Sequence, residues 1–85
     1  MQTRASFPIR SLQQYMRLAR LAADGGRGFT QEGASRRIPV SIRSLQYYEI
    51  GQIVPGEDVV RGMARAYGTP ELLDYYYEQE KEEAA

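Results

Sequence analysis

The sequence predicts an all-helical domain of five short helices, because three kinds of local signal alternate along its 85 residues. Apolar residues recur at the spacing of one helix face, as in Leu12, Tyr15 and Met16. Residues that cap helix starts precede these stripes, and glycine or proline follows them. No segment has the composition of a credible strand pair. The chain is therefore expected to be all-α.

The N-terminal region predicts an arm followed by one amphipathic helix. Residues 1–10 contain Pro8 and little periodicity, so they are expected to lie outside the folded domain. Ser11 opens the first helix, and Gln14 three residues later gives a capping-box arrangement. Three glycines among residues 25–28 disfavour helix, because glycine loses the most conformational freedom on folding. Residues 24–28 are thus expected to form a flexible loop.

A second helix is expected from its cap, Thr30, to about Arg37. Pro39 should end it, because proline disfavours the helical conformation of the residue before it, here Ile38. The segment is short, and proline follows it closely. The second helix is therefore expected to lead straight into a tight turn.

The third helix, from Ser41 to about Ile50, carries the strongest local signals in the chain. Ser41 can cap it, while Val40 before the cap and Leu45 at the fourth helical position can form a hydrophobic staple. Gly51 can end the helix in the left-handed conformation. Residues 30–55 thus predict two short helices joined by a tight turn, the second of them well capped.

Two further helices are expected in the C-terminal half. The fourth follows Pro55 and ends at Gly68, and its apolar stripe consists of Val59, Val60, Met63, Ala64 and Tyr67. The fifth begins at Thr69 and Pro70 and carries Leu72, Leu73 and three consecutive tyrosines. Residues 78–85 form an acidic tail that is expected to fray. The folded domain is therefore expected to span residues 11–77.

Size and composition favour a binding module over an enzyme. A domain this small buries only about 60% of its unfolded surface, which leaves little room for a deep active site. There is no His and no Cys, so the commonest general base and all thiolate metal sites are missing. No acid/base pair, phosphate loop or nucleophile motif is recognisable. We expect no catalytic residues, no metal and no cofactor.

The N-terminal sequence lacks the apolar core of a signal peptide, and no apolar run approaches the roughly 20 residues that span a bilayer. A cytoplasmic protein without membrane contact is expected. Charge is divided unevenly, since residues 1–43 hold eight Arg against two acids, a net of +6, and residues 44–85 carry a net of −6. This asymmetry indicates a basic face for a polyanion, although an ordinary solvated surface would have the same composition.

The motifs of residues 11–74 resemble those of the Cro/C1-type (XRE) helix-turn-helix family of phage repressors and small bacterial regulators. Gln31 matches the glutamine that opens the family's second helix, VSIRSL matches the start of its recognition helix, and YEIG matches that helix's end. Pro55 and the series Ala64, Tyr67 and Gly68 match the fourth-helix pattern. The resemblance implies a five-helix, lambda-repressor-like helix-turn-helix domain that binds double-stranded DNA.

The chain departs from the family pattern in its second helix and turn. Pro39 stands at the place of the usual turn glycine, and because proline does not adopt a positive φ, the turn is expected to be built differently. Gly33 and Ala34 replace the family's Glu and Leu, which removes a capping box at Thr30 and a core side chain. The second helix is therefore expected to be less stable than in other members.

In a recognition helix that begins at Ser41, the exposed side chains near its N-terminal end are the candidates for reading bases. Arg43 can donate to guanine, Gln46 can pair with adenine, and Ile42 or Tyr47 can pack on a thymine methyl. Tyr47 could equally cover the edge of the core. Candidates for phosphate contacts are Thr30, Gln31, Ser44, Arg17, Arg36 and Arg37, with Gln31 assigned by the resemblance.

The family resemblance also implies a partly buried structural ion pair between Arg20 of the first helix and Glu49 of the recognition helix. The tyrosine helix raises the question of assembly, because three consecutive tyrosines point in three directions. A homodimer is expected through Leu73, Tyr75, Tyr76 and Tyr77, although these rings could instead cap the core of one chain.

The resemblance implies a transcriptional regulator, most simply a repressor of the phage or mobile-element type, with no small-molecule effector. The alternative is a module that keeps the helix-turn-helix fold but docks on a protein. Salt dependence separates the two, since DNA binding that neutralises phosphates weakens steeply with added salt.

Overall fold

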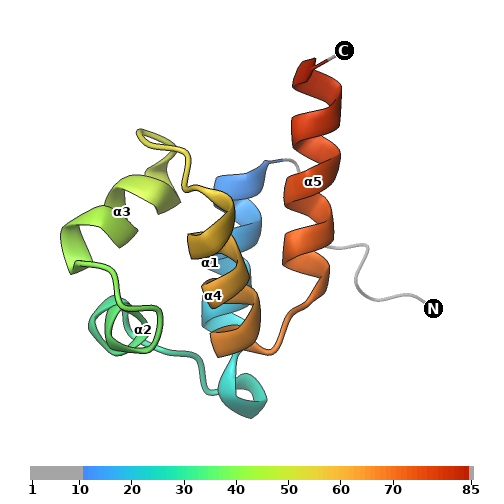
Figure 1. The fold of residues 1–85 in the computed structure, drawn as a ribbon. Helices are drawn as coiled ribbons and strands as arrows, with labels where there is room; N and C mark the ends of the chain where they lie inside the picture. The colour runs from blue at the N-terminus through green and yellow to red at the C-terminus, as the bar shows by residue number, and fades with distance from the viewer. Residues whose placement is uncertain (1–10, 85) are drawn as a thin grey trace.

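The computed structural model is all-helical, as predicted from the sequence, and describes residues 11–84, with side chains for residues 11–79 (Figure 1). This part of the chain contains five α-helices and one turn of 3-10 helix. None of the helices is long and apolar enough to cross a membrane. The elements are α1 (Leu12–Ala22), η2 (Asp24–Gly26), α2 (Gln31–Arg37), α3 (Ile42–Ile50), α4 (Glu57–Tyr67) and α5 (Glu71–Ala84).

The predicted N-caps are present at the first three α-helices. Each capping hydroxyl accepts a hydrogen bond from the backbone N–H three residues later, at 3.2 Å for Ser11, 3.0 Å for Thr30 and 2.9 Å for Ser41. Such a bond satisfies one of the N–H groups that a helix start leaves without a partner. The positions at which α1, α2 and α3 begin therefore follow from local chemistry.

One hydrophobic core joins α1, α3, α4 and α5, and its largest fully buried side chains are Met16, Leu45, Val60, Met63 and Leu72. In Figure 1, α1, α4 and α5 lie beside one another. The helices α2 and α3 lie on the side of α1 and α4 that faces away from α5. Each such side chain contributes about 1.5–3 kcal/mol relative to an exposed position. Leu45 holds the inner face of α3 in this core, and partly buried Val40 packs against the same core. The predicted staple residues thus both contact the core.

The segment between α1 and α2 is a hydrogen-bonded turn, where a flexible loop was expected. The N–H of Gly28 donates to the carbonyl of Ala23 at 2.8 Å, and the N–H of Phe29 donates to the carbonyl of Arg20 at 3.1 Å. A Cβ at Gly28, whose φ is +78°, would lie 2.7 Å from the carbonyl oxygen of Leu21. Glycine is therefore required here because the chain passes close to the end of α1.

The tyrosines of α5 are largely used within the chain. Tyr76 is 6% exposed in the core, and the ring of Tyr75 packs edge-on against Tyr15 with centroids 5.2 Å apart. Tyr77 stays exposed, and its hydroxyl donates to Glu57 at 2.8 Å. Leu73 is partly buried against the core. Of the expected dimer residues, only Tyr77 is exposed, at 38%.

The acidic C-terminal residues continue α5, where the sequence suggested a frayed tail after residue 77. The helix runs from Glu71 to Ala84 without a break. The expected N-terminal arm, residues 1–10, lies outside the described residues.

The turn between α2 and α3 contradicts the expectation for Pro39. Its φ is +32°, on the side of the map that glycine prefers, and Ile38 keeps a near-helical φ of −99° and ψ of −1°. The N–H of Val40 donates to the carbonyl of Ser35 at 3.2 Å, which is the long bond of a Schellman motif. Burial of Ile38 holds the residue against α4 despite the following proline. The turn therefore has proline at its position of positive φ and still forms the long bond of the Schellman motif.

The C-terminal ends of α3 and α4 each contain a backbone hydrogen bond that the end of α2 lacks. Gly51 and Gly68 close Schellman motifs with positive φ, and in each the glycine N–H makes the second, shorter-range bond. Proline has no N–H, so this bond is missing at Pro39. The pyrrolidine ring also disfavours a positive φ, and backbone strain of this kind costs about 1–3 kcal/mol. The end of α2 is thus the weakest of the three.

We therefore expect Pro39→Gly to raise the free energy of unfolding by about 1 kcal/mol, because relief of strain exceeds the entropy that glycine adds to the unfolded chain. Urea denaturation followed by circular dichroism measures the change. Pro55→Gly is the matched control, since this buried proline lies in a different connection, and we expect it to destabilise. A loss of stability in Pro39→Gly would show that residue 39 does not need a positive φ.

Candidate nucleic-acid interface

The first turn of α3 presents polar and apolar side chains to solvent while its opposite face is held in the core. Ile42, Arg43 and Gln46 are exposed, and Tyr47 is partly buried. Leu45 and Glu49 are buried on the inner face, which follows from their four-residue spacing. The four residues expected to read bases thus lie on the outer side of a helix whose orientation is set by its inner side.

The two serines at the start of α3 form a local hydrogen-bond pair. Ser41 accepts from the N–H of Ser44 and donates its own hydroxyl proton to the Ser44 hydroxyl oxygen at 2.9 Å. The hydroxyl proton of Ser44 is therefore free to be donated outward. The helix start also carries partial positive charge. This end of α3 can therefore donate hydrogen bonds to a phosphate oxygen.

A buried ion pair connects α1 with α3. Arg20 donates to both carboxylate oxygens of Glu49, at 2.7 Å from Nε and 2.8 Å from Nη2, and donates from Nη1 to the carbonyl of Phe29 at 2.9 Å. The two side chains are only 9% and 3% exposed. The hydrogen bond to Glu49 raises the pKa of Arg20 above its ordinary value. This bidentate pair fixes the back of α3 to the first helix.

Gln31 extends this network from the core to the exposed face of α3. Its Nε2 donates to Glu49 Oε1 at 3.1 Å, and its Oε1 accepts from Gln46 Nε2 at 3.4 Å. Because the carboxylate accepts only, the amide nitrogen of Gln31 must face Glu49, which leaves the amide oxygen for Gln46. The side chain of Gln46 is therefore oriented by a chain of hydrogen bonds that begins at Arg20.

From the family resemblance, Gln31 was expected to bind a phosphate and to brace the recognition helix, but its partners Glu49 and Gln46 were not foreseen. The signal was present in part, because Gln46 and Glu49 are three residues apart and so share one side of α3. The sequence did not show that the start of α2 lies next to that side of α3.

The arginines expected at phosphates have different surroundings. Arg36 pairs with Glu32 at 3.1 Å on the exposed side of α2. Arg37 lies over the ring of Phe29, 4.3 Å from its centroid, which is a cation–π geometry. Arg17 is exposed on α1. Of these three, Arg37 therefore has a role within the fold that the sequence did not reveal.

Tyr67 carries a buried hydroxyl that has no hydrogen-bond partner among the described residues. The residue is 5% exposed, and its ring lies 6.3 Å from that of Phe29. Burial raises the pKa of this hydroxyl, with a further contribution from the charge of Glu49. The hydroxyl is therefore neutral, and its burial lowers the free energy of unfolding because no hydrogen bond replaces its contact with water.

Tyr67→Phe is accordingly expected to leave the free energy of unfolding unchanged or to raise it by about 1 kcal/mol, since an unpaired buried hydroxyl costs about 1–3 kcal/mol. Thermal unfolding of the two proteins measures the difference. Tyr77→Phe is the control, because it removes a hydroxyl that does have partners. A clear loss of stability in Tyr67→Phe would mean that a buried water satisfies this hydroxyl.

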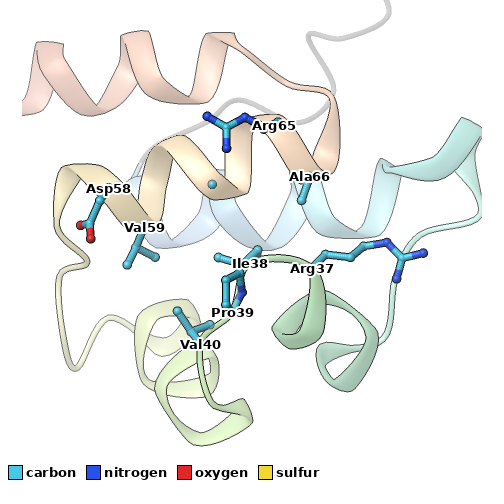
Figure 2. A pocket seen from close by; sticks show the side chains of 9 residues that line it. Arg37, Ile38, Pro39, Val40, Asp58, Val59, Arg65 and Ala66 are labelled. Atoms are coloured by element: carbon cyan, nitrogen blue, oxygen red, sulfur yellow. The ribbon is translucent and has the colours of Figure 1, made fainter.

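A groove of about 590 Å³ separates the α2–α3 turn from α4 (Figure 2). Ile38, Pro39 and Val40 form one wall, and Val59, Gly62 and Ala66 of α4 are among the residues of the other. The charged residues Arg37, Asp58 and Arg65 also line it. The groove therefore has a mixed aliphatic and charged lining, and none of its lining residues belongs to α3.

Comparison with known proteins identifies a helix-turn-helix domain in this chain. Residues 11–74 match the family model described as a helix-turn-helix domain. A search of curated proteins finds no match, and neither does a search of solved structures. Helix-turn-helix domains of this kind indicate a DNA-binding regulator. Since the matched residues cover most of the chain and include all the elements described above except the greater part of α5, the chain belongs to the helix-turn-helix domain family.

Proposed function

We propose that this protein is a sequence-specific regulator that binds double-stranded DNA, with the first turn of α3 in the major groove. The observation that carries the proposal is the hydrogen-bonded series Arg20, Glu49, Gln31 and Gln46, because it orients an exposed amide directly after that turn. An amide held in one orientation has a fixed donor and acceptor order. That order is what discrimination between base edges requires.

Two side chains provide the polar base contacts in this proposal. Arg43 donates bidentately to N7 and O6 of guanine, and Gln46 pairs with N6 and N7 of adenine. Ile42 and Tyr47 pack on thymine methyl groups beside them. Because each good bidentate contact discriminates by about 1–3 kcal/mol, these two residues account for most of the sequence preference.

The phosphate contacts position the domain without reading sequence. Thr30, Gln31 and Ser44 lie at the starts of α2 and α3, where backbone N–H groups and the helix dipole favour anions. Arg17, Arg36 and Arg37 add positive charge. The net charge of +6 on residues 1–43 supports this orientation toward a polyanion, with the acidic C-terminal half turned away.

The most direct reading of the family resemblance is a repressor of the phage or mobile-element type that acts in the cytoplasm. Binding to an operator would block transcription by occupying the site. A homodimer on a two-fold operator is the form that helix-turn-helix docking favours.

The second candidate is a module that docks on another protein and does not bind DNA. The groove between the α2–α3 turn and α4 favours it, because aliphatic side chains lie there beside the charged Arg37, Asp58 and Arg65, a combination found in protein interfaces. The two candidates differ in the dependence of binding on ionic strength. DNA binding that neutralises several phosphates falls steeply with salt because it releases condensed counterions, whereas docking on a protein releases none and depends less on salt.

The test is selection of binding sites from random duplex DNA with the purified full chain. We expect a short motif that contains guanine and adenine positions to be enriched. We expect affinity for it to fall steeply between about 50 and 200 mM salt, because a protein that makes about 6–10 phosphate contacts releases that many counterions. Failure to enrich any motif would overturn the DNA-reading function and favour the docking module.

A further inference from the structure

Gly62 lies in the middle of α4, at a place where the fold does not require glycine. Its backbone is helical, and a Cβ at this position would lie 3.5 Å from Cγ2 of Ile38, which is ordinary van der Waals contact. Glycine inside a helix is less favourable than alanine, because it loses more conformational freedom on folding. The fold is therefore less stable at Gly62 than it would be with alanine, and no clash accounts for this.

The space beside Gly62 is part of the groove between α4 and the α2–α3 turn (Figure 2). Val59 and Ala66 share this side of α4 with Gly62, because they lie three residues before it and four residues after it. Ile38 and Val40 belong to the opposite wall. The volume of about 590 Å³ lies within the range of pockets that hold ligands. The absence of a side chain at Gly62 thus keeps open a groove with aliphatic walls.

The charged residues of the groove are separated along its length. In Figure 2, Asp58 lies at one end and Arg37 lies toward the other. Arg65 follows Asp58 by seven residues on α4, which is about 10 Å along the helix axis. Among the described residues, no ion pair involves any of these three side chains. The groove therefore carries a carboxylate at one end and two guanidinium groups toward the other, and none of these charges is neutralised within the described chain.

Opposite charges on either side of an aliphatic centre fit a short peptide in extended conformation. Such a peptide advances about 3.3 Å per residue and turns alternate side chains to one face. Three alternate positions therefore span about 13 Å, which is comparable to the separation along α4 because the charged side chains are long. A single small carboxylate would pair with the arginines and leave Asp58 without a partner. The spacing therefore favours a peptide over a small anion.

We propose that the groove binds an extended segment of another protein that carries an acidic, an aliphatic and a basic residue at alternate positions. The acidic residue pairs with Arg65 and Arg37. The aliphatic side chain lies over Gly62, and the basic residue pairs with Asp58. The proposal rests on the docking role of the groove and names the chemistry of the partner. It extends that role to a chain that also binds DNA, because no lining residue belongs to α3.

The experiment is selection with the purified full chain, without DNA, from a displayed library of random peptides of about seven residues, which is long enough to cover the groove. We expect the enriched sequences to carry an acidic, an aliphatic and a basic residue at alternate positions. The most strongly enriched sequence is then synthesised, and fluorescence anisotropy measures its affinity for the wild-type chain and for the variants.

Two variants test the contacts in the groove. Arg65→Gln changes an exposed side chain and should weaken binding of the synthesised peptide about ten-fold, the usual effect of losing one hydrogen bond to a charged group. Gly62→Val fills the space beside α4 and should weaken binding at least as much, and thermal unfolding checks that this variant is folded. Arg17→Gln is the matched control, because this exposed arginine lies on α1 and does not line the groove, so binding should stay unchanged.

Charge reversal tests the orientation of the peptide. A peptide with lysine in place of its acidic residue should bind Arg65→Glu more tightly than it binds the wild-type chain, because the two new charges attract each other. Equal affinity for the two proteins would overturn the pairing of the acidic residue with Arg65.

Absence of any enriched peptide, or enriched sequences without this pattern, would overturn the proposal. Unchanged binding in Arg65→Gln would overturn it as well, and this exposed position decides the outcome if Gly62→Val does not fold. These results leave the DNA-binding function in place, because selection of duplexes and the Arg43→Ala variant test that function separately.

Discussion

Glu49→Ala is expected to lower the free energy of unfolding by about 3–5 kcal/mol, because it leaves the guanidinium of Arg20 buried without its partner. Small domains have only about 5–15 kcal/mol of stability in total, so the variant should be largely destabilised. The loss also frees Gln31, whose amide donates to the same carboxylate. Urea denaturation followed by circular dichroism measures the change.

Two controls separate loss of the buried pair from loss of a carboxylate as such. Glu57→Ala removes an exposed partner of Arg61 and should change stability far less than Glu49→Ala, because exposed ion pairs contribute little. The double variant Arg20→Met with Glu49→Leu removes both charges and should be more stable than Glu49→Ala, since apolar replacement of a buried pair is often neutral. A Glu49→Ala protein with an unchanged melting temperature would rule out a structural role for the pair.

Arg43→Ala is expected to weaken binding to the selected duplex by about 1–3 kcal/mol, which is roughly 5- to 150-fold, and to relax preference at one base pair. The side chain is exposed on the first turn of α3, so the fold should not change. Competition binding with every base pair substituted at each motif position gives both results. Stability is measured in parallel to show that the loss comes from contact.

Arg36→Ala is the matched control for base reading, because its guanidinium lies on α2 and pairs with Glu32. A contact to phosphate adds affinity but no sequence information, so this variant should weaken all sequences by a similar factor. If Arg43→Ala kept both the affinity and the specificity of the wild type, guanine readout by this residue would be wrong.

Much of the fold was predictable because it depends on residues close together in the chain. Ser11, Thr30 and Ser41 cap helices through bonds that span three residues, and Gly51 and Gly68 end helices through their own φ angles. The apolar stripes mark which helix faces are buried. Such signals act within one or two turns, so they can be recognised without knowledge of the tertiary structure.

The predictions that failed concern contacts between residues that are far apart in the chain. The positive φ of Pro39 contradicts a strong local rule, and it is accompanied by the burial of Ile38 against another helix. The role of Gln31 depends on the approach of α2 to Glu49, 18 positions away. The α5 tyrosines contact α1 and α4, which local sequence does not show. Side-chain partners across the core are thus the part that required the structure.

The most direct test of the central claim is to follow the backbone amide resonances of the full chain by NMR while the selected duplex is added. We expect the largest changes at the starts of α3 and α2, from Ser41 to Gln46 and at Thr30 and Gln31, with α5 almost unaffected. Changes confined to the groove residues of α4, such as Val59 and Ala66, with α3 unperturbed, would contradict recognition of DNA by α3.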